Sequence, residues 1–194
     1  MGFILASTSP RRRALMEMLG VGPFRVIPSG SEELVTPGLT PEQTVCKLAT
    51  EKVFAVSQLS EKYGIMKDDI IIAADTMVFL DGHLMSKPDS EHEAVNMLSS
   101  LSGRRHTVFT GVAVVRGDVS IVGAESTDVY FRDIKMAEIL KYVKTGEPMD
   151  KAGAYGAQGY GAVFVERVEG DFYNVVGLPL CRLSIMLRDF DVYL

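Results

Sequence analysis

Two short turn motifs place the strongest limit on the fold of this chain. Asp81-Gly82 follows an apolar stretch, Asp69–Leu80, that has the composition of a strand. Gly117-Asp118 stands between two further stretches of this kind, Thr107–Arg116 and Ser120–Phe131. Two-residue turns of this composition join antiparallel strands. Helical patterns are interspersed with the strands, so the sequence predicts an α/β fold with a mixed sheet and flanking helices.

The first twenty residues predict a strand followed by a helix. An apolar run, Phe3–Ala6, leads to Ser9, a favourable N-cap, and to Pro10, a favourable first helical residue. Gly20 stands where a glycine commonly ends a helix. The helical spacing predicts an inner face formed by Leu15, Met18 and Leu19.

Capping residues mark two later helices. Thr40–Gln43 is a capping box with proline at the first helical position, and we expect its helix to reach about Lys62. Ser90 and Glu93 form a second capping box. The last expected elements are a hairpin with strands over 161–168 and 171–176, and a helix to about Phe190.

The composition is that of an ordinary globular protein. The 194 residues are 47% hydrophobic and 23% charged, and we expect one domain over residues 1–194. A net charge of −5 argues against nucleic acid or a membrane surface as a partner. Cys46 and Cys181 lie far apart, and we expect reduced, buried thiols in a cytoplasmic protein.

Three arginines in the first turn of the predicted helix indicate an anion site. Arg11, Arg12 and Arg13 oppose the helix dipole there, at roughly 0.3–1 kcal/mol each. Backbone N–H groups at a helix start, with guanidinium groups beside them, form a phosphate site. The alternative is a basic first turn that faces solvent.

An acidic residue follows the most apolar run of the chain. Asp75 comes directly after Ile70–Ala74, where a carboxylate is costly to bury unless it is paired or holds a metal ion. Asp75 is therefore a candidate general base or metal ligand. The alternative is a carboxylate that accepts hydrogen bonds from a neighbouring loop. The hydroxyl of Thr76 could face a pocket, or Thr76 could be only a β-branched residue of the strand.

Three further segments could bind a nucleotide or a metal ion. Lys87 follows the Asp81-Gly82 turn and could hold a phosphate, or it could be a surface lysine. Gly146–Gly161 is rich in glycine, which would let a ligand approach the backbone closely, and Gln158 within it offers hydrogen-bond donors and an acceptor. The alternative is that this segment is only a mobile loop. Glu32 and Glu33 could complete a divalent-metal site with Asp75, or they could be solvated surface residues.

Taken together, these segments resemble the Maf family of nucleoside triphosphate pyrophosphatases over nearly the whole chain. The motifs that carry the resemblance occur in family order: LASTSPRRRALMEMLG, IIAADTMVFLDGHLMSKP, LSGRRHTVFTGV, GEPMDKAGAYGAQGYGAVFV and NVVGLPL. The resemblance implies two lobes around a nucleotide-binding cleft, a fold shared with the inosine triphosphate pyrophosphatases. It also implies hydrolysis of a nucleoside triphosphate to the monophosphate and pyrophosphate with a divalent cation, Mg²⁺ or Mn²⁺, and it makes a homodimer plausible.

The resemblance also implies a set of functional residues. Asp75 stands at the position of the proton acceptor, and Glu33 and Asp75 are the implied metal ligands. The other positions that match the family pattern are Ser7, Arg12, Lys52, Lys87 and Gln158. We expect the cationic members to bind the triphosphate and to stabilise the departing pyrophosphate.

Three positions indicate the nucleotide base. Arg11, Thr76 and Gln158 match the subgroup that acts on dTTP and UTP, whereas the subgroup that acts on 7-methyl-GTP reads SPWRR, DQ and SEG. A neutral amide both donates and accepts, which suits the carbonyl, N–H, carbonyl edge of uracil and thymine. Ala157 departs from the usual isoleucine before this glutamine.

Two alternatives stay open at this stage. The substrate could be a modified nucleotide such as 7-methyl-GTP, pseudo-UTP or 5-methyl-UTP. The protein could also be a cell-division (septum) regulator that binds nucleotide with little turnover, although Asp75 and Lys87 favour an enzyme.

Overall fold

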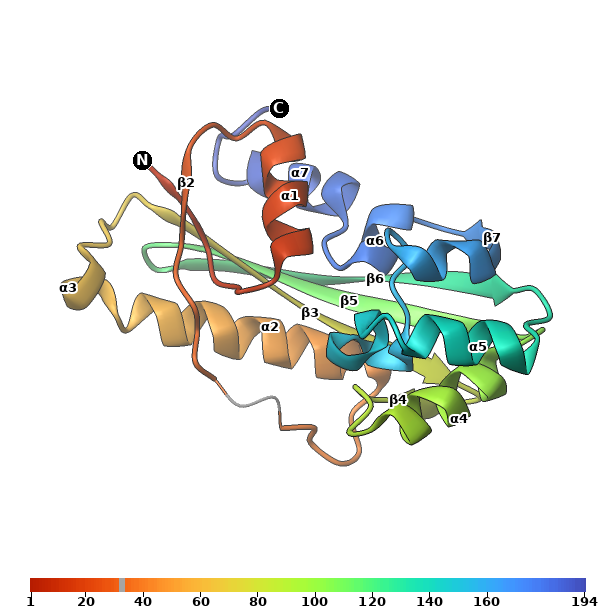
Figure 1. The fold of residues 1–194 in the computed structure, drawn as a ribbon. Coiled ribbons are helices and arrows are strands. Elements are labelled where there is room, and N and C mark those ends of the chain that lie inside the picture. The colour runs from red at the N-terminus through yellow and green to blue at the C-terminus, as the bar shows by residue number, and fades with distance from the viewer. Residues whose placement is uncertain (32–33) are drawn as a thin grey trace. The chain divides into compact units, whose positions relative to one another are not determined.

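The computed structural model describes residues 1–31 and 34–194. Seven strands form one sheet in the order β2-β1-β3-β5-β6-β7, with β4 paired to β3 (Figure 1). The strands are β1 Phe3–Leu5, β2 Phe24–Val26, β3 Ile70–Leu80, β4 His83–Met85, β5 Arg105–Arg116, β6 Val119–Phe131 and β7 Val165–Glu169. The helices are α1 Pro10–Leu19, α2 Pro41–Ser57, α3 Ser60–Tyr63, α4 Glu91–Leu101, α5 Met136–Val143, α6 Phe172–Val176 and α7 Leu180–Arg188, and three short 3₁₀ turns are η1 Glu147–Asp150, η2 Ala152–Ala154 and η3 Tyr160–Phe164.

The predicted mixed sheet is confirmed by the strand directions. β1 runs parallel to both β2 and β3, whereas β4 is antiparallel to β3 and β7 is antiparallel to β6. Asp81-Gly82 forms the predicted two-residue turn, since Leu80 pairs with His83 and both turn residues have positive φ. That backbone conformation is the one that such hairpin turns require.

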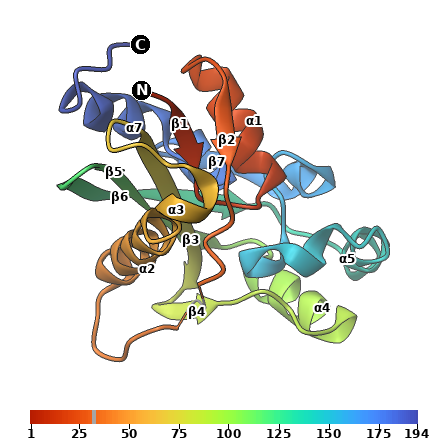
Figure 2. The ribbon, with the colours of Figure 1, turned by 90° about the vertical axis from the view of Figure 1, so that its left-hand side faces the viewer.

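The chain divides into two compact units. Unit 1 contains Met1–Asp75, Thr110–Glu125 and Gly177–Leu194, and unit 2 contains Thr76–Phe109 and Ser126–Val176. In unit 1, α2 covers one face of the strands while α1 and α7 cover the other (Figures 1 and 2). The core between α2 and the sheet consists of buried apolar side chains from the helix, from β3 and β5, and from β1 and the residues directly after β1 and β2: Ile4, Ala6, Ile27, Ala49, Val53, Val56, Ile71, Ala73, Ala113 and Val115.

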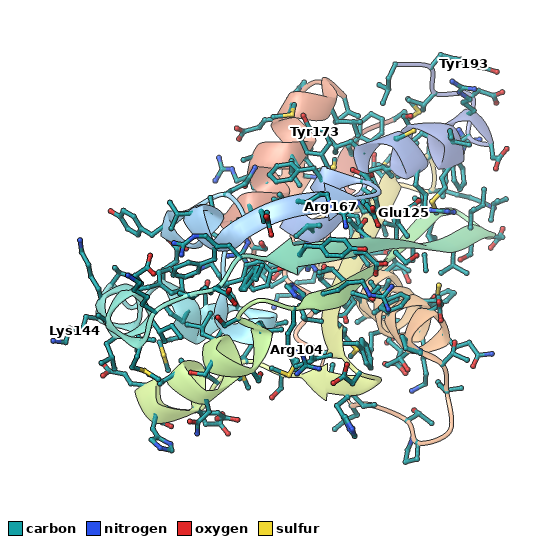
Figure 3. The ribbon with its side chains drawn as sticks, turned by 90° about the vertical axis from the view of Figure 1, so that its right-hand side faces the viewer. Arg104, Glu125, Lys144, Arg167, Tyr173 and Tyr193 are labelled. Carbon is teal, nitrogen blue, oxygen red and sulfur yellow. The ribbon has the colours of Figure 1, made fainter. Side chains whose placement is uncertain are left out.

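Unit 2 is built around α4 and α5, which lie side by side (Figure 2). Its core contains an aromatic cluster, in which Phe131 contacts the rings of His106, Tyr155 and Phe164. At the sheet edge, the Arg167 guanidinium of β7 lies 3.8 Å from the centre of the Tyr130 ring (Figure 3). Cation–π contacts of this kind add modest stability at exposed sites.

The predicted inner face of α1 is wrong in one residue. Met18 has 59% of its surface exposed, whereas Met16 is fully buried beside Leu15. The Arg12 side chain donates to the carbonyl oxygen of Gly177, and Met16 is one turn further along the same helical face. The anchor at Arg12 thus fixes the rotation of the helix, and it brings Met16 rather than Met18 inward.

The helix that begins at Pro41 is shorter than the spacing predicts. α2 ends at Ser57, and α3 follows as a separate turn from Ser60. The Ser57 hydroxyl donates to the carbonyl oxygen of Phe54, and the Ser60 hydroxyl donates to that of Ser57. Serine hydroxyls that bond to backbone carbonyls compete with the helical pattern, which explains the break.

The predicted strand over 171–176 is wrong, because this segment forms α6. The Asp171 carboxylate accepts a hydrogen bond from the backbone N–H of Tyr173 at 2.7 Å. An aspartate that caps the following N–H groups starts a helix. The expectation of two buried cysteines is wrong as well: both are free thiols, but Cys181 is exposed and Cys46 is half-buried.

Candidate active site

The arginine at position 12 is fixed in place at the start of α1. Its Nε donates to the carbonyl oxygen of Gly177 at 2.8 Å, and its Nη1 lies 3.5 Å from the buried Ser7 hydroxyl. Ser9 is the predicted N-cap, and its hydroxyl accepts from the backbone N–H of Arg12. The first turn therefore holds a guanidinium in a defined orientation beside a serine hydroxyl.

The other two arginines of the first turn differ from Arg12. Arg13 is exposed and pairs with Glu17 one turn along the helix, at 3.3 Å. Such a pair adds only a few tenths of a kcal/mol, about 0.3–0.5. Arg11 is half-buried. Arg13 thus fits the alternative of a basic turn that faces solvent, whereas Arg12 is held in place as an arginine of an anion site would be.

Gly177 is a contributor that sequence reasoning did not assign. It belongs to the NVVGLPL motif, for which the residue types alone suggested no chemistry. Its carbonyl oxygen accepts from Arg12 across 165 positions of sequence. No local pattern could have indicated this contact, because it depends on how the C-terminal segment packs against α1.

Lys52 and Asp75 form a buried ion pair. Lys52 Nζ lies 2.5 Å from Asp75 Oδ1, and the two residues have only 7% and 3% of their surfaces exposed. Lys52 lies on the inner face of α2 because it follows Val45 and Leu48 at helical spacing. A carboxylate and an ammonium group in such surroundings must remain together, since removing one leaves an unpaired buried charge.

A glycine lets α2 come close enough to the sheet for this pair to form. A Cβ atom on Gly111 of β5 would lie 2.2 Å from the carbonyl oxygen of Val45. The helix backbone therefore rests directly on β5 at Val45, two turns before Lys52. This contact supports the helix that carries the lysine.

Strand register brings Ser7, beside Arg12, and the Lys52–Asp75 pair to the same end of the sheet in unit 1. Leu5 of β1 pairs with Ile72 of β3, and the N–H of Ala6 donates to the carbonyl oxygen of Ile72. In a parallel pair the loop after one strand emerges beside the next residues of its neighbour. Ser7 is thus placed next to the segment of β3 that ends unit 1 with Asp75.

The donor set at Asp75 suits a hard divalent cation only in part. Glu33, the other predicted ligand, lies outside the described residues. Within residues 1–31 and 34–194, no group of three His, Cys, Asp or Glu side chains is arranged to hold a metal ion. One or two carboxylates are nevertheless enough for Mg²⁺ when substrate phosphates and water supply its other ligands. Asp75 fits that mode of binding.

The three remaining predicted residues belong to unit 2. Thr76 follows Asp75 in β3 and is half-buried, while Lys87 and Gln158 are exposed. β4 ends at Met85, two residues before Lys87. The neighbouring Ser86 carbonyl accepts from the N–H of Gly153, which connects this segment to the glycine-rich one.

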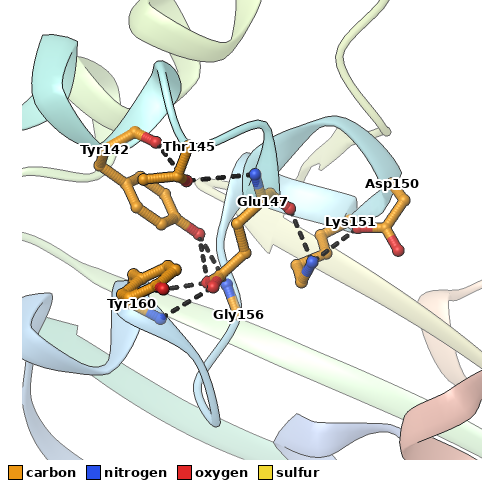
Figure 4. A network of polar contacts seen from close by, with 8 residues as sticks. Tyr142, Thr145, Glu147, Asp150, Lys151, Gly156 and Tyr160 are labelled. Atoms are coloured by element: carbon orange, nitrogen blue, oxygen red, sulfur yellow. Dashed lines mark hydrogen bonds and ion pairs between the residues drawn. The ribbon is translucent and has the colours of Figure 1, made fainter.

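The glycine-rich segment is an ordered structure around one carboxylate. Glu147 Oε1 accepts from the Tyr142 hydroxyl at 2.9 Å and from the N–H of Gly161 at 3.2 Å, and Oε2 accepts from the N–H of Tyr160 at 2.8 Å (Figure 4). The Tyr142 hydroxyl in turn accepts from the N–H of Gly156 at 3.1 Å. Sequence reasoning missed Glu147, because its donors come from α5 and from the far end of the segment.

These contacts shift the pKa values of both side chains. Burial alone would raise the pKa of Glu147, but hydrogen bonds from Tyr160, Gly161 and Tyr142 and the charge of Lys151 lower it overall. Burial and the Glu147 carboxylate raise the pKa of Tyr142. Glu147 is therefore ionised and Tyr142 is neutral at pH 7, as their hydrogen bonds require.

The comparison with known families and curated proteins matches almost all of the chain. The family described as Maf-like protein matches residues 2–190. A dTTP/UTP pyrophosphatase of Caldicellulosiruptor saccharolyticus is 47% identical, over 95% of this chain and 92% of that protein. The proteins of the same name from Aquifex aeolicus and Bacillus thuringiensis are 45% and 43% identical, over 99% and 97% of this chain and 97% and 95% of those proteins.

A solved structure supports the fold alone. The HAM1 protein of Coxiella burnetii superimposes with a TM-score of 0.51 at 13% sequence identity, and the match covers 97% of this chain and 99% of that one. Within the described residues, none of the helices combines the length and the apolar character needed to cross a membrane.

Proposed function

The chain belongs to the family of Maf-like proteins, and from this premise we propose that it hydrolyses dTTP and UTP to the monophosphate and pyrophosphate. The names of its relatives support this activity and this choice of base. The buried Lys52–Asp75 pair is the observation that carries the proposal. A protein that only binds nucleotide needs no carboxylate held in this way.

In the proposed reaction, Asp75 accepts a proton from a water molecule while the oxygen of that water attacks the α-phosphorus. The bond from that phosphorus to the bridging oxygen breaks, and the electron pair leaves with pyrophosphate. Lys52 holds Asp75 in place through the hydrogen bond from its Nζ to Asp75 Oδ1, and its ammonium charge is proposed to attract a phosphate oxygen. Water activation by a positioned carboxylate contributes about 10²–10⁴-fold in rate.

The cationic residues are proposed to bind the triphosphate. Arg12 is oriented by Ser7 and Gly177, and a guanidinium is the cationic group whose planar shape suits a phosphate. Lys87 is proposed to stabilise charge on the departing pyrophosphate. Ser7 and the N-terminus of α1 would position a phosphate oxygen.

A divalent cation would be held by Asp75 and Glu33, and the substrate phosphates would supply further ligands. When bound, Mg²⁺ or Mn²⁺ would neutralise charge on the phosphates during the displacement. We also propose a cytoplasmic location, where the nucleotide pool is found. The homodimer stays a prediction from the family resemblance.

Base recognition is proposed to rest on Arg11, Thr76 and Gln158. Gln158 is exposed at the tip of the glycine-rich segment, where its amide can both donate and accept. A site that satisfies the uracil edge leaves polar groups unpaired against other bases. Thymine adds only a methyl group, which is worth about 1 kcal/mol, so both nucleotides are expected substrates.

The test is pyrophosphate release by the purified protein with Mg²⁺ or Mn²⁺. The substrates are dTTP, UTP, CTP, GTP, ITP, pseudo-UTP, 5-methyl-UTP and 7-methyl-GTP. Preference for dTTP and UTP supports the proposal, whereas preference for 7-methyl-GTP keeps the chemistry and rejects the base assignment. If none of them is cleaved, a nucleotide-binding regulator becomes the better explanation.

A further inference from the structure

The glycines around Gln158 face protein atoms, and this observation leads to a role for Glu147. A Cβ atom on Gly159 would lie 2.2 Å from Glu147 Oε2, and one on Gly156 would lie 2.9 Å from Oε1. One on Gly161 would lie 2.9 Å from the Tyr142 hydroxyl. The glycines are therefore required because the backbone wraps closely around a carboxylate of the same segment.

Both ends of the turn that carries Gln158 are attached to this carboxylate. The N–H of Gly159 donates to the carbonyl oxygen of Gly156 at 3.2 Å and closes the turn. Gly156 is held through the Tyr142 hydroxyl, and Tyr160 donates directly to Glu147. Ala157, inside the turn, packs against the core of unit 2, so the backbone on both sides of Gln158 is held.

A second contact fixes the base of the segment. Lys151 Nζ donates to the backbone carbonyl of Glu147 at 2.6 Å, and its side chain lies close to Gly156. Glu147 is thus held through its backbone while its carboxylate holds the turn (Figure 4). Gln158 lies in the middle of this framework and is exposed.

We propose that Glu147 is the positioning residue for base recognition: its carboxylate fixes the turn so that the Gln158 amide meets the pyrimidine in one orientation. This inference rests on the proposed function, because it assumes that Gln158 contacts the base. Precise placement matters for a side chain that discriminates by hydrogen bonds, since a misplaced amide satisfies the wrong edge as well as the right one.

Glu147→Gln is the informative substitution, because it keeps size and shape. Three N–H and O–H donors converge on the two carboxylate oxygens, and a glutamine replaces one oxygen by an NH₂ group. Whichever oxygen is lost, a backbone N–H donor then faces the new NH₂ group, and its hydrogen bond is lost. The expected effect is a loosened turn in a folded protein.

Glu138→Gln provides the matched control. The Glu138 carboxylate also lies in unit 2 and accepts from a backbone N–H, that of Lys135, and from Arg132. Arg132 and Lys135 both precede α5 and lie outside the 156–161 segment. The same substitution there removes the same charge without reaching Gln158.

The experiment compares Glu147→Gln, Gln158→Ala, the double variant and Glu138→Gln. It measures kcat and KM for UTP and CTP. We expect Glu147→Gln to lower the ratio of kcat/KM for UTP over CTP by about 10-fold, mainly through KM for UTP. The double variant should match Gln158→Ala alone, because a positioning residue has no effect once the residue it positions is gone. Glu138→Gln should leave the ratio unchanged.

Amide hydrogen exchange at Tyr160 and Gly161 supplies a readout that does not depend on activity. Exchange should be slow in the wild type and Glu138→Gln and fast in Glu147→Gln. Faster exchange with an unchanged UTP:CTP ratio, or additive effects in the double variant, would overturn the inference alone. A wild type without preference for UTP would overturn base recognition by Gln158, and the inference with it.

Discussion

Asp75 in unit 1 is buried and Glu147 in unit 2 is half-buried, and different groups satisfy the two carboxylates. Asp75 meets an ammonium group from a helix 23 positions away, whereas Glu147 meets neutral donors, the Tyr142 hydroxyl of α5 and N–H groups of its own segment. A cation can be shared with an incoming phosphate, so the first arrangement is open to chemistry. Neutral donors that are all engaged only hold a shape. The comparison separates a reactive carboxylate from an architectural one.

The sharpest test applies the same change, carboxylate to amide, to both residues. Asp75→Asn should lower kcat by about 10²–10⁴-fold, because an amide cannot accept the proton from water. Binding of dTTP, measured by calorimetry, should be largely retained, since the Asn oxygen can still accept from Lys52. Glu147→Gln should instead keep kcat and change selectivity.

Near-normal turnover by Asp75→Asn would contradict the assignment of Asp75 as the base. Urea unfolding of the same samples verifies that the variant is folded. Glu138→Gln, measured in parallel, reports what the loss of a carboxylate costs away from both sites.

The second test concerns the support of the reactive pair. Gly111→Ala should destabilise the protein by about 3 kcal/mol or more, because its Cβ would overlap the Val45 carbonyl and neither backbone can move cheaply. Urea unfolding measures this loss. Gly123→Ala is the control: the nearest atoms to its Cβ would belong to the long side chains of Arg182, at 3.2 Å, and Met186, at 4.0 Å, so the expected cost is below about 1 kcal/mol.

The third test uses pH and the core of unit 2. Burial lowers the pKa of His106 to about 4, and its Nε2 bonds to the Tyr155 hydroxyl at 2.8 Å. The unfolded state, with the ordinary pKa of 6.5, then binds more protons. Stability should be full above pH 6.5 and should fall by about 3 kcal/mol as the pH drops to about 4.

Unfolding free energies measured from pH 7 to pH 4 provide the comparison. The pH dependence should be reduced in His106→Gln and unchanged in His83→Gln, which replaces an exposed histidine of β4. A slope that survives in His106→Gln would assign the acid sensitivity to other groups.

The smallest expected effect tests the structural role of Glu147 by changing Gly159, the residue that packs against its carboxylate. Gly159→Ala places a Cβ against the Glu147 carboxylate, although the backbone at Gly159 has negative φ and would itself accept alanine. We expect the kcat/KM ratio of UTP over CTP to fall by about 10-fold with little loss of global stability. An unchanged ratio would mean that the turn adapts without moving Gln158.

Local signals predicted much of the fold, and contacts between distant segments account for the errors. The starts of α1, α2 and α4 were predictable from Ser9, Thr40 and Ser90, because a cap depends only on its next few residues. Strand patterns in 171–176 were overruled by the cap at Asp171. The orientation of α1 was not predictable, since it depends on a bond to Gly177.

The candidate site shows the same division. The residue types around Asp75 and the first turn of α1 indicated chemistry, and Lys52 entered only through family resemblance. The pairing of Lys52 with Asp75 joins a helix to a strand, which no spacing in the chain reveals. Glu147 was not predictable, because glycines in a sequence indicate space for a ligand, whereas here they make space for a carboxylate.

The wrapped segment around Glu147 also bears on how this protein could acquire a new substrate. Gly156, Gly159 and Gly161 admit no larger side chain without displacing a neighbour, whereas Gln158 between them is exposed and carries no such restriction. Single-base changes in a glutamine codon reach glutamate, lysine, histidine, arginine, leucine and proline. Each variant except proline would be displayed on the same backbone. Substitutions are therefore tolerated at position 158 rather than at the glycines, and base preference can change there without a change in the surrounding backbone.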